Sequence, residues 1–198
     1  MLKAKTIGLF FGSFNPIHTG HLIIAEFMAT RTDLDQVWLV VSPHNPLKKR
    51  STLAKDFDRL HMVRLAIEDN PKLKESNIEF SLPKPSYTID TMVYLHEKYP
   101  QHTFSLIMGG DNLTSIHKWK NFELLLERYP IHIYQRPGSP IPELPPNADI
   151  RTYDVPTLNI SSTYIRQSIA EGKSIRYLVP DPVFEFLDGS SLYKNQSS

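Results

Sequence analysis

Apolar runs alternate with amphipathic stretches along this chain, and the first such pair is the most informative. An apolar segment that begins near Thr6 leads into small and turn-forming residues around Gly12 and Asn15, and a second apolar segment, residues 22–28, follows. This order predicts a buried strand, a tight loop and a helix that begins near Gly20.

The same patterns predict the later elements. Continuous or alternating apolar residues predict strands at residues 37–41, 78–82, 104–108, 131–134 and 150–155. Helices are predicted near residues 57–67, 86–99, 122–128, 160–171 and 179–187. Strands that alternate with helices favour an α/β fold with a doubly wound parallel sheet, whose ligands bind beyond the carboxyl ends of the strands. The glycine-bearing strand ends at Gly12 and Gly109 should then face one crevice.

Two helices have features that predict how they sit. In the helix near residues 57–67, apolar residues recur at intervals of three and four from Phe57 onward, which predicts the buried face. Charged residues between them, Arg59 included, predict the exposed face. Ser86 or Thr88 is expected to cap the helix that follows.

Two segments are predicted to be surface loops. Residues 44–51 are polar and basic, and they should lie over the same strand ends as the first loop. Residues 137–147 are dense in proline and are followed at once by a predicted strand, which favours an irregular loop over a linker. We therefore expect a single domain over residues 1–198, with a small helical part at about residues 160–190.

Charge and composition narrow the classes of partner and compartment. The 198 residues include 22 basic and 21 acidic side chains, so no overall field would attract nucleic acid or an anionic membrane. There is no cysteine, which excludes disulfides, thiolate metal sites and a cysteine nucleophile. No apolar run approaches the ~20 residues that span a bilayer. A cytoplasmic protein that binds small molecules is expected.

The first loop carries the candidate chemistry. It matches neither the dinucleotide fingerprint nor the phosphate loop of P-loop hydrolases. His18 and His21 could be a metal pair, a packing or capping pair, or donors to phosphate. A zinc site needs further ligands, whereas Gly12, Ser13 and a helix start beside the histidines suit an anion. The phosphate interpretation is therefore favoured over the other two.

Two motifs carry a resemblance to a known family. Residues 11–21, F-G-S-F-N-P-I-H-T-G-H, resemble the G-G-[ST]-F-[DN]-P-[IV]-H-x-G-H signature of the nucleotidylyltransferase superfamily, with Phe11 in place of its first glycine. Residues 160–166, I-S-S-T-Y-I-R, are similar to its second signature, I-S-[ST]-[ST]-x-[IV]-R. The resemblance implies a Rossmann-like, doubly wound parallel sheet with helices on both faces.

Within that superfamily, the chain resembles the bacterial nicotinate-nucleotide adenylyltransferase family over nearly its whole length. The similar segments are S-P-H-N-P-L-K at residues 42–48, P-S-Y-T-I-D-T at residues 85–91, G-G-D at residues 109–111 with Trp119 beyond it, and Q-R-P-G at residues 135–138. The resemblance implies transfer of AMP from ATP to nicotinate mononucleotide, with Mg²⁺ accompanying the ATP. No protein ligand to the metal is implied, and a homo-oligomer is possible.

The resemblance also implies the residues of the site. His18, His21 and Arg166 would be catalytic. ATP would be bound by the catalytic residues together with Gly12, Ser13, Phe14, Gly109, Asp111, Ser161 and Thr163. Nicotinate mononucleotide would be bound by Lys48, Thr88, Asp111, Trp119 and Arg136.

Two other functions remain open from the sequence. One is nucleotidyl transfer to a different phosphate acceptor, such as phosphopantetheine or glycerol phosphate, although residues 85–91 and the segment from Asp111 to Trp119 argue against it. The other is a nucleotide sensor without catalysis, which the presence of both histidines and Arg166 gives no reason to prefer.

Overall fold

A computed structural model describes residues 3–43, 53–135 and 148–194. The predicted loops at residues 44–51 and 137–147 lie outside this part of the chain, as do Lys48 and Arg136. The strands are β1 Thr6–Gly12, β2 Gln36–Val41, β3 Leu73–Ser76, β4 Thr103–Gly109, β5 Ile131–Gln135 and β6 Ile150–Asp154. The α-helices are α1 Thr19–Arg31, α2 Asp56–Ile67, α3 Thr88–Lys98, α4 Gly110–Leu113, α5 Phe122–Arg128, α6 Ser162–Ala170 and α7 Asp181–Asp188, with 3-10 turns η2 Ile78–Ser81 and η3 Ile116–Lys118.

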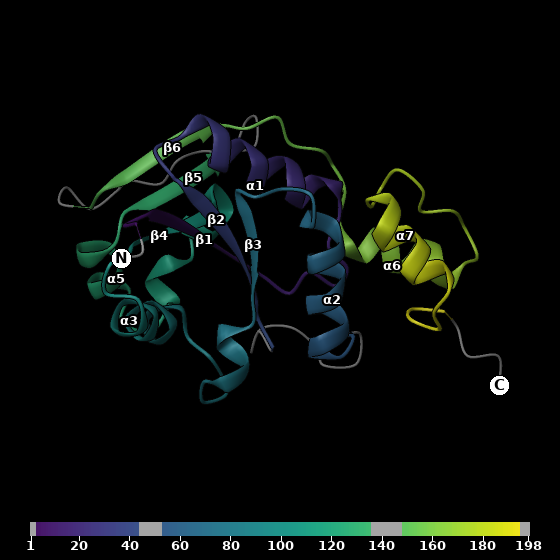
Figure 1. Ribbon diagram of the computed structural model, residues 1–198, viewed down its shortest axis with the longest axis horizontal. Helices are drawn as coiled ribbons and strands as arrows, with labels where there is room; N and C mark the ends of the chain where they lie inside the picture. The colour runs from purple at the N-terminus through teal and green to yellow at the C-terminus, as the bar shows by residue number, and fades with distance from the viewer. Residues whose placement is uncertain (1–2, 44–52, 136–147, 195–198) are drawn as a thin grey trace.

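The strands form one parallel sheet in the order β3-β2-β1-β4-β5-β6, which confirms the predicted α/β, doubly wound fold. The chain moves outward from β1 to β3 and then returns to pair β4 with the other side of β1. The loops after β1 and β4 therefore leave the sheet in opposite directions and open a crevice between them, where ligands bind in such folds. Figure 1 shows α1 lying across the sheet, with α6 and α7 on the right, beyond α2.

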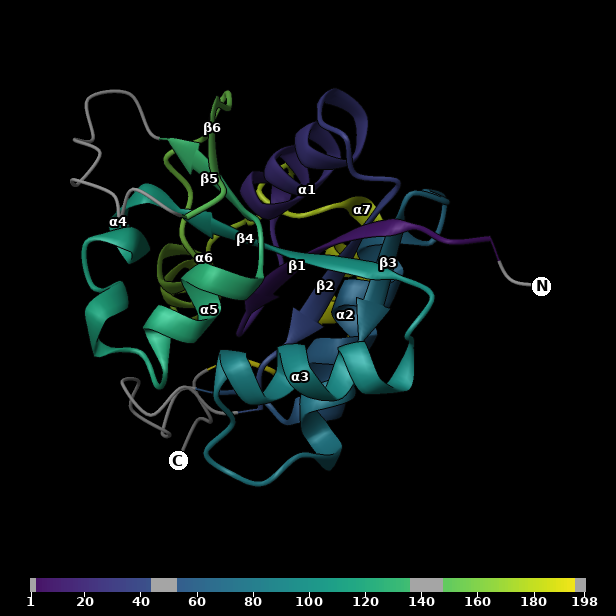
Figure 2. The same cartoon turned by 90° about the vertical axis from the view of Figure 1, so that its left-hand side faces the viewer.

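The core lies in two layers, one on each face of the sheet. Alternate residues of β1 point to opposite faces: Phe10 belongs to the layer under α1, α2, α6 and α7, whereas Ile7 and Leu9 belong to the layer under α3 and α5. Figure 2 shows α1 on one side of the sheet, with α3 and α5 on the other. The strands are continuous apolar runs because both faces are covered.

The predicted strand at residues 78–82 is wrong. The edge strand β3 precedes it, and residues 78–81 form the turn η2. β3 pairs only with β2 and buries only Leu73 and Ser76, so its sequence need not be apolar. Ile78 is buried against the second layer without being in a strand.

The predicted cap of α3 is also wrong. Tyr87 occupies the N-cap position, and no side chain caps the helix there.

The buried face of α2 includes Leu60, Val63 and Ile67 as predicted, but it differs from the prediction at two positions. Phe57 is 72% exposed, whereas Arg59 is fully buried. Its guanidinium donates hydrogen bonds to the carbonyl oxygens of Ser13 at 2.6 Å and Ser42 at 2.9 Å, and to the carboxylate of Asp56 at 2.7 Å. A charged side chain in the core needs such partners, and Arg59 finds them in the loops that leave β1 and β2.

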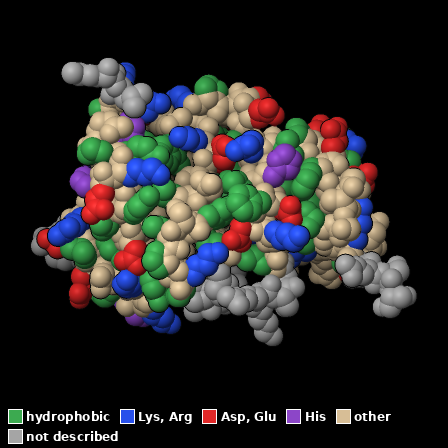
Figure 3. Space-filling view, turned by 60° about the horizontal axis from the view of Figure 1, so that its bottom comes forward, with side chains coloured by type: hydrophobic (Ala, Val, Ile, Leu, Met, Phe, Trp, Pro, Cys, Tyr) green, Lys and Arg blue, Asp and Glu red, His purple; other side chains and the backbone are tan. Residues whose placement is uncertain are grey.

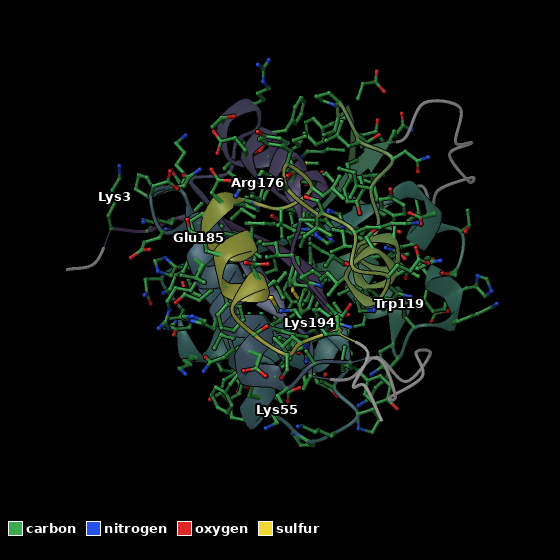
Figure 4. The ribbon with its side chains drawn as sticks, turned by 90° about the vertical axis from the view of Figure 1, so that its right-hand side faces the viewer. Lys3, Lys55, Trp119, Arg176, Glu185 and Lys194 are labelled. Atoms are coloured by element: carbon green, nitrogen blue, oxygen red, sulfur yellow. The ribbon has the colours of Figure 1, made fainter. Side chains whose placement is uncertain are left out.

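The C-terminal segment packs on the α1 side of the sheet. Leu178 accepts a backbone hydrogen bond from Thr19 at 3.0 Å, and the Tyr193 hydroxyl donates to the Asn15 side chain at 2.5 Å. Arg176, labelled in Figure 4 beside α7, lies over the Phe184 ring at 4.4 Å. The last described residues thus help to hold the first loop.

The surface carries charges of both signs. Figure 3 shows Lys and Arg side chains interspersed with Asp and Glu side chains on one face, in keeping with 22 basic and 21 acidic residues. Within the described ranges, no helix is both long and apolar enough to cross a membrane.

We predict that Arg59→Met lowers the free energy of unfolding by roughly 3–5 kcal/mol, because it leaves buried carbonyl oxygens and Asp56 without their donor. Urea titration measures the loss. The control is Arg64→Met on the same helix, because Arg64 is 61% exposed and pairs with Glu75 at the surface; it should cost less than about 1 kcal/mol. Equal losses would contradict a special role for Arg59.

Candidate active site

A cavity of about 530 Å³ opens where the loop after β1, the start of α1 and the start of α6 meet. Seven of the sequence-predicted residues line it: Gly12, Ser13, His18, His21, Ser161, Thr163 and Arg166. The structure thus brings the two motifs, which are far apart in the sequence, to one cavity. Its described lining contains imidazoles, hydroxyls and a guanidinium, and no carboxylate. This set of side chains suits a polyanion.

The first loop is shaped by Gly12 and Phe14. A Cβ at Gly12 would lie 2.7 Å from the Phe14 ring, so only glycine leaves room for that ring. Phe14 has a φ of 43°, a strained conformation for a bulky residue. It is 1% exposed, and its ring packs edge-on against His21 with 5.1 Å between centroids. Phe14 therefore lies beneath the cavity and supports a histidine.

His18 and His21 form a stacked pair at the start of α1, with 3.7 Å between ring centroids. The backbone N–H of His18, the N-cap residue, donates to Nδ1 of His21 at 3.2 Å. Neutral His21 therefore carries its proton on Nε2, from which it can donate. A Cβ at Gly20 would lie 3.1 Å from the His18 ring, so glycine lets that ring lie close to the helix start.

Burial determines the charge of His18. The residue is 6% exposed, and burial lowers the pKa of its imidazole to about 4, against the opposing effect of a backbone hydrogen bond. His18 is therefore neutral near pH 7 and interacts with an anion as a dipole.

The start of α6 forms the other wall of the cavity. Ser161 caps the helix by accepting from the Tyr164 N–H at 3.2 Å. Arg166 donates to the Asn15 carbonyl at 2.7 Å and to the Thr163 hydroxyl at 3.3 Å. These bonds hold the guanidinium between the first loop and the first turn of α6. A helix amino terminus beside a fixed guanidinium attracts phosphate groups.

The Asn15–Pro16 turn is held from several sides. The Ser162 hydroxyl donates to the Pro16 carbonyl at 2.9 Å, and the Asn15 side chain accepts from the Ala54 N–H at 3.1 Å. The sequence indicated only a turn at Asn15, and no pattern within the motif marks its partners. The turn is thus fixed by helices that come later in the chain.

The remaining predicted residues lie elsewhere at the carboxyl edge of the sheet. Gly109 ends β4 and Asp111 follows it on α4, while Thr88 begins α3 and Trp119 follows η3. None of the four lines the cavity as described.

Two contacts join the start of α3 to the segment just after Trp119. Lys120 pairs with Asp90 at 2.8 Å, and its ammonium lies 4.9 Å from the centroid of the Tyr87 ring. Asp90 and Tyr87 belong to the start of α3, so the chain just after Trp119, which is labelled in Figure 4, is held beside that helix start.

The cavity also has apolar and hydroxyl-bearing walls that the sequence did not indicate as site residues. These are Leu53, Tyr134, Thr157, Leu158 and Ile160, together with Phe10 and Ile24. Tyr134 could have been predicted as a site residue from its place near the carboxyl end of a strand, β5. An apolar wall beside a phosphate-binding edge would suit the base of a nucleotide.

A metal centre finds no support among the described residues. Over this part of the chain, His, Cys, Asp and Glu do not form a group of three or more that could hold a metal ion. Within the described ranges, His18 and His21 therefore belong to no group of metal-ligating side chains large enough for a metal site.

Comparisons with known proteins point to one family. Residues 9–168 match the family described as cytidylyltransferase-like. A probable nicotinate-nucleotide adenylyltransferase of Flavobacterium johnsoniae is 54% identical over 194 residues, covering 95% of this chain and 98% of the relative. One from Cytophaga hutchinsonii is 54% identical over 189 residues, covering 96% and 98%.

Solved structures share the fold. A putative nicotinate-nucleotide adenylyltransferase from Vibrio parahaemolyticus superposes with a TM-score of 0.71 at 24% identity, covering 93% of this chain and 99% of that one. The nicotinic acid mononucleotide adenylyltransferase of Plasmodium falciparum, complexed with NaAD, superposes with a TM-score of 0.77 at 20% identity, covering 96% and 97%.

We predict that His18 stays neutral down to about pH 5, which NMR titration of its ring measures directly. The unfolded chain takes up this proton near pH 6.5 and the folded chain only near pH 4. The stability associated with neutral His18 is therefore present above pH 6.5 and is lost as the pH falls toward 4, by up to about 3 kcal/mol. In His18→Asn, the free energy of unfolding should lack this contribution to the decrease between pH 6.5 and pH 4. A ring that titrates near 6.5 would contradict the prediction.

Proposed function

Because this chain belongs to the nicotinate-nucleotide adenylyltransferases of the cytidylyltransferase-like family, we propose that it transfers AMP from ATP to nicotinate mononucleotide. The products are nicotinate adenine dinucleotide (deamido-NAD) and pyrophosphate, so the reaction belongs to NAD biosynthesis. The observation that carries the proposal is the cavity in which His18, His21 and Arg166 converge.

The reaction needs alignment and charge stabilisation more than it needs acid–base chemistry. The 5′-phosphate of the acceptor is already an anionic nucleophile, so neither a general base nor a covalent enzyme intermediate is required. It attacks the α-phosphorus of ATP, and the bond to the bridging oxygen of pyrophosphate breaks. The site lowers the barrier by holding the two phosphates in line and stabilising the charge that grows on the departing oxygens.

The cavity divides this task between its two walls. His18 and His21, with Gly12 and Ser13, contact the α-phosphate from the start of α1. His18 is neutral, and His21 donates from Nε2. Arg166 brings a full positive charge to the described walls. Ser161, Thr163 and Arg166 hold the β- and γ-phosphates. Gly109 and Asp111 bind the nucleoside of ATP, and Phe14 acts from beneath by supporting His21.

The acceptor binds across the crevice, on the side of α3. Thr88 and the N–H groups at the start of α3 receive the carboxylate of the pyridine ring, and Trp119 stacks on that ring. Asp111 accepts from ribose hydroxyls. We assign the acceptor phosphate to Arg136 or Lys48, both of which lie outside the described residues. A carboxylate placed at an uncapped helix start is favoured by the helix dipole.

Mg²⁺ enters with ATP, bound mainly by phosphate oxygens and water. The donor set agrees with this, because the described lining of the cavity has no carboxylate to hold the ion. When bound, the ion neutralises phosphate charge.

The cytoplasmic location, the possible homo-oligomer and the single-domain organisation stay predictions from the sequence.

We predict that the protein with Mg·ATP releases pyrophosphate when nicotinate mononucleotide is added. A coupled pyrophosphate assay measures this, with nicotinamide mononucleotide and phosphopantetheine in parallel reactions. Release with phosphopantetheine alone would favour the alternative acceptor. No release with any acceptor, together with ATP binding, would favour the nucleotide sensor.

We predict that His21→Ala lowers kcat by about 10²-fold or more, because it removes a donor used mainly in the transition state, while the KM for ATP changes little. Steady-state kinetics measure both constants. His96→Ala is the control, since His96 is an exposed residue in the last turn of α3. Near-normal turnover of His21→Ala would return the histidine pair to a structural role.

A further inference from the structure

Glu79 is a buried carboxyl that the proposed chemistry does not use. It lies in η2 and is 2% exposed. Its Oε1 accepts a hydrogen bond from the Thr91 hydroxyl at 2.9 Å, and among the described residues its Oε2 makes no direct hydrogen bond. Burying a carboxyl in this way costs free energy, so the position calls for an explanation.

The neighbours of Glu79 come from three separate segments. Thr91 belongs to α3, Ser86 to the turn before α3, and Ser42 follows the end of β2. Burial raises the pKa of the Glu79 carboxyl, and the nearby Ser42, Thr91 and Ser86 hydroxyls lower it in part. Through Thr91, the Glu79 side chain therefore joins the first turn of α3 to η2.

This arrangement leaves the start of α3 uncapped. Tyr87 at the N-cap position has no oxygen that caps the helix, and no side chain caps it there. Thr91 also bonds back to the Tyr87 carbonyl, at 3.3 Å, which closes the first turn around Glu79. Helix starts are usually satisfied by a side chain, so the first N–H groups of α3 are left for another acceptor.

We propose that Glu79 is a positioning residue for the acceptor nucleotide: through its hydrogen bond with Thr91 it holds the first turn of α3 beside the end of β2, so that the N–H groups of α3 meet the acceptor's carboxylate. This inference rests on the proposed function, in which Thr88 and the start of α3 bind the pyridine carboxylate. Glu79 itself is not among the residues that line the cavity.

Ser42 connects this turn to the ATP side of the crevice. Its N–H donates to the Gly12 carbonyl at 2.9 Å, and its own carbonyl accepts from Arg59 at 2.9 Å. The Glu79 turn is thus anchored to the same backbone that carries the first loop. Because the ATP loop has its own support from Arg59 and Arg166, loss of Glu79 should disturb the acceptor side first.

The test separates the two substrates. Glu79→Ala should raise the KM for nicotinate mononucleotide by about tenfold, the effect of one lost hydrogen bond, and change the KM for ATP by less than about twofold. Glu79→Gln keeps an oxygen for Thr91 and should restore most of the loss. The control is Glu75→Ala on the adjoining edge strand, whose carboxylate pairs with exposed Arg64. An equal rise in both KM values would overturn the proposal.

A second measurement does not depend on activity. Amide hydrogen exchange at residues 86–91 of the unliganded protein should be faster in Glu79→Ala than in wild type, and unchanged in Glu75→Ala. Unchanged exchange in Glu79→Ala would overturn the positioning role. If the wild-type protein released no pyrophosphate, the proposed function would be wrong. The hydrogen-exchange measurement would still test whether Glu79 positions the start of α3. If Glu79→Ala does not fold, Thr91→Val removes the same hydrogen bond with little change of shape and should show both effects.

Discussion

The buried guanidinium of Arg59 is the interaction on which the candidate site depends. Parallel strands end in loops whose carbonyl groups no longer have strand partners, and a buried carbonyl without a donor is costly. Arg59 supplies donors to Ser13, after β1, and to Ser42 and Pro43, after β2, at distances of 2.6 to 3.4 Å. One rigid side chain thus fixes two loops at the edge where ligands bind.

The two motifs form one site through the same kind of bond. Arg166 donates to Asn15 and Ser162 donates to Pro16, so α6 holds the backbone of the first loop. Because these donors are already oriented, little reorganisation is needed when phosphate charge moves during the reaction. Burial keeps His18 neutral, whereas Arg166 carries a full positive charge and lies beside the β- and γ-phosphates in the proposed mechanism.

The sequence predicted the elements better than it predicted their buried polar contacts. The helix at residues 122–128 and the strand starting at Ile131 have the predicted positions, since apolar periodicity records burial directly. β3 was missed because an edge strand needs few apolar residues. Arg59 and Glu79 look like surface charges in a pattern, and only tertiary partners from distant segments make them core residues. The motifs predicted residues that the structure brings to one cavity, whereas the binding roles of these residues and of the acceptor residues remain predictions from resemblance.

The two proposed nucleotide sites differ in which face of the sheet supports them. α1 and α6 pack on one core layer and α3 and α5 on the other, so the proposed ATP and acceptor sites are supported by different helices. Between them, the Ser42 N–H bonds to the Gly12 carbonyl after β2 and β1, and β1 pairs with β4 in the middle of the sheet. An in-line reaction between two phosphates requires their separation to be held closely. The parallel sheet lies between both layers and carries the strand ends of both sites, so in the proposed mechanism it sets that separation. Arg59 fixes the loops after β1 and β2 to the sheet edge, and Glu79 has the proposed role of holding the start of α3.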